Sequence, residues 1–160
     1  MKVYKIIILL LQFEINIIAQ QYEVKLNSIT NNDTVLSIAI QIKSDSKVES
    51  LLGNATIRFS YDQNKLIFPD QSIIGKDYNF ICVNSKHYLC SVTKPSSNTI
   101  SVNIYYRQDN PVIITEEFSE IARIKFKKKY KDANYKFDHF NAEIFSPNDS
   151  KPWNVVVNSE

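Results

Sequence analysis

The stretch Thr34–Lys43, with the sequence TVLSIAIQIK, alternates apolar and polar or small side chains at every second position. Its apolar members on one side are Leu36, Ile38, Ile40 and Ile42. Successive side chains of a β-strand point to opposite faces of the sheet. The stretch therefore predicts a strand with one face in a hydrophobic core and the other face toward water.

The same alternation recurs along the chain in Ala55–Tyr61, Thr99–Tyr106 and Ile121–Lys127. Weaker strand candidates are Tyr22–Leu26, Leu66–Phe68, Tyr78–Val83, Tyr88–Thr93, Tyr135–Phe137, Ala142–Phe145 and Val155–Val157. No segment carries a sustained apolar stripe with the 3.6-residue period of a helix. One-sided strands bury their apolar faces against one another, so the sequence predicts an all-β, two-sheet antiparallel β-sandwich.

Composition agrees with one compact domain. The chain has 160 residues with 44% hydrophobic and 22% charged side chains, which argues against disorder. The 19 Lys and Arg nearly cancel the 17 Asp and Glu, which argues against a dedicated nucleic-acid binder. Only 2 Gly are present, which excludes a Gly-rich phosphate loop.

Residues 1–20 are typical of a secretory signal peptide. Lys2 and Lys5 precede the apolar run Ile6–Leu11, and the small residue Ala19 follows. We expect cleavage at Ala19 or Gln20, leaving residues 21–160 as the mature, secreted domain with no transmembrane segment. The alternatives are a buried first strand or an uncleaved anchor.

Cys82 and Cys90 are the two cysteines of the chain, and seven residues separate them. An exported protein meets an oxidising compartment, so a structural disulfide is expected, tying the arms of a hairpin near its turn. A zinc site with His87 as third ligand is an alternative, but its fourth ligand would have to be the distant His139. Free thiols are the remaining alternative.

The predicted strands also follow a familiar order. The sequence LGNATIRFSYD at Leu52–Asp62 is followed by Leu66–Pro69, Thr99–Tyr106, Ile121–Lys127, Asn141–Phe145 and Trp153. This pattern resembles the cohesin-like domains of the carbohydrate-binding-module superfamily, as found in secreted proteins of bacteria with type IX secretion.

The resemblance implies a jelly-roll sandwich of about nine strands, with the first and last strands adjacent. It also implies a non-catalytic binding module. Cohesins use one sheet face to hold a dockerin, and related modules bind polysaccharide on a flat face. The strands matching that face would be Ala55–Tyr61, Thr99–Tyr106 and Ile121–Lys127.

The outward residues of these three strands form the predicted binding patch. Its members are Arg58, Ser60, Asn103, Tyr105, Arg123 and Lys125. Tyrosine and arginine provide contact area and directed hydrogen bonds, and Tyr105 could stack on a sugar ring while Asn103 bonds its hydroxyls. The alternative is an ordinary solvated sheet face.

Other features have a simpler interpretation beside a functional one. The basic run Lys125–Lys131 could bind an anionic polymer or could keep a strand edge soluble. Trp153 could be a sugar platform but is expected to pack beside a terminal strand. Asp62, Asn64 and Asp70 could hold calcium, although their irregular spacing favours a turn.

Catalytic motifs are missing from the sequence: it has no Gly-x-Ser-x-Gly elbow, His-Glu-x-x-His helix or phosphate loop. We therefore expect no enzyme and no cofactor or metal. The predicted partner is a polysaccharide or an extracellular protein, not nucleic acid. The alternative function is a self-assembling subunit of an extracellular fibre or surface layer, extended by strand addition.

Overall fold

The computed structural model describes residues 21–45, 49–68, 80–82, 86–107, 109–131, 135–148 and 150–159. The predicted signal peptide lies outside these residues. Every regular element in the described part is a β-strand, which confirms the predicted all-β class. No described segment forms a helix long and apolar enough to cross a membrane.

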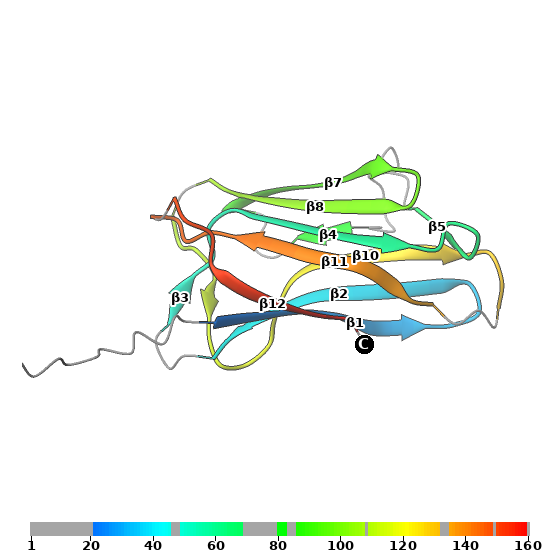
Figure 1. Cartoon of the computed structure of the whole chain (residues 1–160), viewed down its shortest axis with the longest axis horizontal. Helices are drawn as coiled ribbons and strands as arrows, with labels where there is room; N and C mark the ends of the chain where they lie inside the picture. The colour runs from blue at the N-terminus through cyan, green and yellow to red at the C-terminus, as the bar shows by residue number, and fades with distance from the viewer. Residues whose placement is uncertain are drawn as a thin grey trace, which may run out of the picture.

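Two sheets form the body of the molecule (Figure 1). The six-stranded sheet has the order β12-β1-β2-β10-β5, with β6 also pairing with β10. Its strands are β1 (Gln21–Asn31), β2 (Val35–Ser44), β5 (Leu66–Ile67), β6 (Phe80–Cys82), β10 (Ser119–Lys128) and β12 (Asn154–Ser159). The pairings are antiparallel except that between β1 and β12, which is parallel.

The four-stranded sheet has the order β11-β4-β8-β7 and is antiparallel throughout. Its strands are β4 (Ala55–Tyr61), β7 (Tyr88–Ser96), β8 (Thr99–Tyr106) and β11 (Phe137–Ile144). A separate ribbon joins β3 (Ser50–Leu51) to β9 (Ile113–Ile114). Nine of the twelve strands in the described residues are at least three residues long, close to the expected number.

The apolar faces of the two sheets share one core, as the sequence predicted. Phe126 of β10 packs against Tyr61 of β4, with ring centroids 5.6 Å apart, and against Phe137 of β11 at 5.9 Å. The alternating residues of the opening stretch, from Leu36 to Ile42, are among the buried ones. The adjacency of the first and last strands is also confirmed, because β1 pairs with β12.

Short polar residues turn the chain where glycine is scarce. Asn32 forms the β1–β2 turn, where its Oδ1 accepts hydrogen bonds from the amides of Thr34 (3.1 Å) and Val35 (2.8 Å). Asp109 and Asn110 have φ angles of 63° and 49°, a left-handed conformation that Asp and Asn tolerate better than most residues.

Two sequence-based expectations about the arrangement are wrong. The strand Ile121–Lys127 belongs to β10 in the six-stranded sheet, whereas β4 and β8 lie in the opposite sheet. Cys82 and Cys90 are not the two arms of a hairpin, because β6 pairs with β10 and β7 pairs with β8. Their disulfide instead joins the two sheets.

Candidate binding face

The outer surface of the four-stranded sheet carries four of the six predicted binding residues. Arg58 and Ser60 lie on β4, and Asn103 and Tyr105 lie on β8. The two strands are antiparallel neighbours, and Arg58 is in register with Ser101. These alternating positions point away from the core, so the structure brings the four residues onto one face, called here the four-stranded face.

Small polar side chains form the middle of the four-stranded face. The Asn103 Oδ1 accepts hydrogen bonds from the hydroxyls of Ser101 (3.2 Å) and Thr56 (3.4 Å), so these neighbours fix its amide group. Ser60 is only 9% exposed and Ser101 only 3%. The polar atoms in the middle of the face are therefore held by their neighbours, and the half-buried Thr56 and Asn103 expose more of them than the two serines do.

One end of the face is apolar. Tyr105 of β8 is in register with Leu89 of β7, and the two side chains are 49% and 50% exposed. Sequence reasoning missed Leu89, although Tyr88 and Val92 are the inward residues of the same alternation and leave Leu89 outside. Of the aromatic side chains on β4, β7 and β8, Tyr105 is the exposed one. A large aliphatic and a large aromatic side chain together form a contact surface suited to a protein partner.

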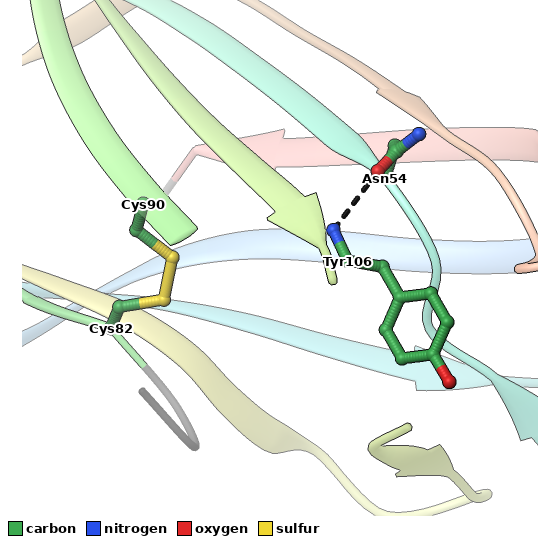
Figure 2. The surroundings of a disulfide bond; sticks show 4 residues. All are labelled: Asn54, Cys82, Cys90 and Tyr106. Carbon is green, nitrogen blue, oxygen red and sulfur yellow. Dashed lines mark hydrogen bonds between the residues drawn. A yellow bond between two sulfur atoms is a disulfide. The ribbon is translucent and has the colours of Figure 1, made fainter. Parts of the chain in front are cut away.

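The disulfide holds the strand that carries Leu89. Cys90 follows Leu89 on β7, and its Cα lies 6.1 Å from that of Cys82 on β6 (Figure 2). The same figure shows the Asn54 Oδ1 accepting a hydrogen bond of 3.0 Å from the amide of Tyr106, immediately after Tyr105. Both strands bearing the apolar pair are therefore anchored next to it.

A buried hydroxyl group holds this end of the sheet to the loops beneath. The Tyr88 hydroxyl donates to the Leu52 carbonyl oxygen (2.5 Å) and accepts from the Val112 amide (3.0 Å). Burial raises the pKa of Tyr88 above its usual value, although the hydrogen bond from Val112 acts in the opposite direction.

The remaining two predicted binding residues lie on the opposite side of the molecule. Arg123 and Lys125 belong to β10, so they cannot share a surface with Arg58. Arg123 donates two hydrogen bonds to the carboxylate of Glu120, at 2.9 and 2.7 Å. These bonds raise the pKa of the Arg123 guanidinium. The pattern of alternation shows which residues point outward but not which sheet a strand joins.

A cleft of about 440 Å³ lies where β1, β2 and β12 meet. It is lined in part by Glu23, Lys43 and Asn158. The Glu23 carboxylate bonds to Lys43 (2.8 Å) and to the Asn158 amide (2.8 Å), and these bonds lower its pKa. A carboxyl group that acts as a general acid near neutral pH needs a raised pKa. The lowered pKa of Glu23 instead keeps its carboxylate charged, as a partner of Lys43 and Asn158.

The other candidate residues have structural surroundings. Trp153 stacks on Tyr22 at 3.8 Å between ring centroids and packs against the core, as expected. The Asp62 Oδ1 accepts a hydrogen bond from the Asn64 amide (2.9 Å) within a turn, and Asp70 lies outside the described residues.

Within the described ranges, no group of three or more His, Cys, Asp or Glu side chains is placed to hold a metal ion. His139, with φ of 50°, sits at an irregularity of β11, and the backbone carbonyl of His87 accepts from the Arg107 amide.

Sequence comparison finds no relatives: no family of known proteins matches the chain, and no curated protein matches it. Structure comparison finds proteins of similar fold. The sixth cohesin of scaffoldin B from Acetivibrio cellulolyticus, solved in complex with a Cel5 dockerin, superposes with a TM-score of 0.60 at 12% identity, covering 86% of this chain and 94% of that one. The chain has a cohesin-like fold.

Two further cohesins lead to the same result. The third cohesin of ScaC from Acetivibrio cellulolyticus, solved with the ScaB dockerin, gives a TM-score of 0.57 at 17% identity over 87% of this chain and 94% of that one. The cohesin module of a family 33 glycoside hydrolase from Clostridium perfringens gives 0.57 at 11% identity, covering 89% and 98%. The three superpositions each cover 86–89% of this chain.

Proposed function

We propose that this cohesin-like chain is a secreted, non-catalytic binding module that holds an extracellular protein partner on its four-stranded face. The observation that carries the proposal is the Leu89–Tyr105 pair, two large apolar side chains that lie in register and are about half exposed. Two exposed apolar side chains in register, with polar side chains further along the same face, provide the apolar contact and the hydrogen-bonding groups that a binding face needs. Several structures with the same fold were solved with a dockerin bound.

A polysaccharide is the second possible ligand of this face. Sugar recognition commonly uses aromatic side chains as platforms, and Tyr105 is the exposed aromatic of β4, β7 and β8. The neighbouring Leu89 and the internally bonded Asn103 favour a protein instead. A glycan array tests the alternative: binding that depends on Tyr105 would replace the protein partner by a sugar.

Self-assembly into a fibre or surface layer is a different class of function. The observation favouring it is that β7, nine residues long, lies at the edge of the four-stranded sheet. A second copy could add a strand there. Lys94 and Pro95 in the same strand oppose such pairing. Light scattering coupled to size-exclusion chromatography of residues 21–160 distinguishes a monomer from a growing polymer.

The main test compares two matched double variants. Leu89→Ser with Tyr105→Ser removes the apolar pair of the four-stranded face. Leu51→Ser with Ile113→Ser removes another exposed apolar pair, which is in register on the β3–β9 ribbon. Partners captured from the culture medium of the source organism are purified, and their binding to each variant is measured by calorimetry.

The proposal predicts that the Leu89 and Tyr105 variant loses binding by about a hundredfold, the size expected when two large buried contacts of an interface are removed. The ribbon variant should keep binding within about twofold, because it leaves the face intact. Equal losses in both variants, or a loss in the ribbon variant alone, would move the partner away from the four-stranded face. Circular dichroism of each variant confirms that the sandwich is folded.

A further inference from the structure

The outer face of β10 carries a straight row of positive charges. Arg123, Lys125 and Lys127 occupy alternate positions of the strand, and Lys129 continues the row just beyond it. The Lys129 amide donates a hydrogen bond of 2.8 Å to the Lys65 carbonyl oxygen. The backbone at Lys129 therefore still lies beside the segment that leads into β5. Alternate residues of an antiparallel strand are about 6.8 Å apart, so the four charged positions span about 20 Å.

Three members of this row have no counter-charge. Lys125, Lys127 and Lys129 form no ion pair with any described acidic residue, whereas Arg123 is bound by Glu120. The residues in register with Arg123, Lys125 and Lys127 on the neighbouring strands are all uncharged: Val35, Ser37, Ala39, Ile67 and Ile81. The three lysines therefore have no acidic partner among the described residues, and the side chains in register with the row are uncharged.

Protection of a sheet edge does not explain the row. β10 is an interior strand, with β2 on one side and β5 and β6 on the other. Lysines on an edge strand discourage pairing with another molecule, but Arg123 and Lys127 lie where β10 is paired on both sides and has no free edge to protect. The contrast with Lys128 is clear, because its Nζ turns inward to the Asn31 Oδ1 and over the Tyr135 ring. The outward lysines thus have no comparable structural role.

We propose that this row binds a linear anionic polysaccharide along β10, on the sheet opposite the four-stranded face. Regularly spaced ammonium groups suit a polymer whose carboxylate or sulfate groups also repeat along a line. The flanking side chains Ile67 and Ile81 are 42% and 43% exposed and offer apolar surface to the faces of sugar rings. Single-stranded nucleic acid would instead need aromatic side chains along the row on which successive bases stack. The residues registered beside the row are aliphatic or small, and the exposed Tyr130 follows only its last member.

The test uses residues 21–160 and affinity electrophoresis in gels containing polygalacturonate, heparin, methyl-esterified pectin or no polymer. The row variant carries Lys125→Gln, Lys127→Gln and Lys129→Gln. The matched control carries Lys86→Gln, Lys94→Gln and Lys151→Gln, three exposed lysines elsewhere, and so has the same net charge. We expect one or both of the acidic polymers to retard the wild type, and the row variant to bind about tenfold more weakly at low salt. The control should change by less than about twofold.

Three results would overturn the proposal. They are no retardation by either acidic polymer, equal weakening in the control and row variants, and binding to methyl-esterified pectin as strong as to polygalacturonate. Tighter binding of single-stranded DNA than of both polymers, with the same dependence on the row, would assign the site to nucleic acid instead. The variant with Leu89→Ser and Tyr105→Ser leaves the row intact, so the acidic polymers should still retard it. This result separates the row from the four-stranded face.

Discussion

At the scale of single residues, the support for the four-stranded face comes from a few polar atoms that no sequence pattern shows. The Tyr88 hydroxyl joins Leu52 and Val112, which lie far from it in sequence and flank the ribbon. The Asn54 Oδ1 accepts a hydrogen bond from the Tyr106 amide and so holds the end of β8. The alternation predicted Tyr88 as a strand residue, but the use of its hydroxyl depends on which loops pass beneath it.

Replacing Tyr88 by Phe should lower the free energy of unfolding by about 1–3 kcal/mol, because the Leu52 carbonyl and Val112 amide lose their partner. The effect also depends on pH. The folded-state pKa of Tyr88 is raised above the unfolded value of about 10. Its contribution is therefore complete below about pH 10 and is lost as the pH rises through the folded pKa.

Urea denaturation of wild type and Tyr88→Phe between pH 8 and 11 measures both effects. The decline of stability at high pH should be shallower in the variant, while Tyr105→Phe, which removes an exposed hydroxyl, should follow the wild type. Parallel curves for Tyr88→Phe and wild type would contradict the account.

Gly53 is required by a close backbone approach. Its amide bonds to the Phe145 carbonyl at 2.8 Å, and a Cβ atom at this position would lie 2.6 Å from three backbone atoms of residues 145–147. We expect Gly53→Ala to cost about 1–3 kcal/mol, because the obstructing atoms are backbone and cannot rotate away. Thermal unfolding measures this cost, and Asn54→Ala, which tests the neighbouring contact without a clash, provides the comparison. An unchanged melting temperature for Gly53→Ala would show that the backbone there moves apart freely.

At the scale of elements, the sequence predicted the strands better than their partners. β2, β4, β8 and β10 all fall where alternation placed them, because period two reports which side chains face a core. The assignment of β10 to the six-stranded sheet rests on long-range pairing with β2, which alternation does not encode. For the same reason, two nearby cysteines indicated a hairpin, whereas the structure places them on different sheets. The predicted binding patch is therefore divided between the two sheets.

Removing the Cys82–Cys90 disulfide should lower the free energy of unfolding by about 2.5 kcal/mol, the loop-closure entropy for so short a loop. Cys82→Ser with Cys90→Ser is compared with wild type by urea denaturation. Addition of a reducing agent should weaken the wild type by a similar amount and leave the double variant unchanged. Sensitivity of the double variant to the reductant would show that the effect comes from elsewhere.

At the scale of the whole molecule, the sandwich is completed by its last strand. β12 pairs with β1, and Trp153, just before β12, stacks on Tyr22, whose hydroxyl donates to Ser50 at 2.7 Å. This packing role was expected from the sequence, because a tryptophan beside a terminal strand usually packs against the core. The partner ring could not be predicted, because Tyr22 lies at the far end of the described chain.

Trp153→Ala should cost about 2–3 kcal/mol, since it removes the stacked ring and exposes the Tyr22 side chain to water. Trp153→Phe should recover a large part of this loss, because a smaller ring still covers Tyr22. Tryptophan fluorescence is lost in both variants, so unfolding is followed by circular dichroism. If alanine and phenylalanine give equal stability, stacking on Tyr22 contributes nothing.

The parallel pairing of β1 with β12 has a mechanical consequence. Gln21 is paired with Asn154 and Leu26 with Ser159, so the chain enters this pair at one end of the sandwich and leaves it at the other. A tension applied between the two ends slides the strands along each other, and the backbone hydrogen bonds of all six registered positions resist together. Such a shear geometry withstands force better than a zipper opened one bond at a time. A protein tethered at both ends would gain from this arrangement wherever flow or movement stretches its attachments.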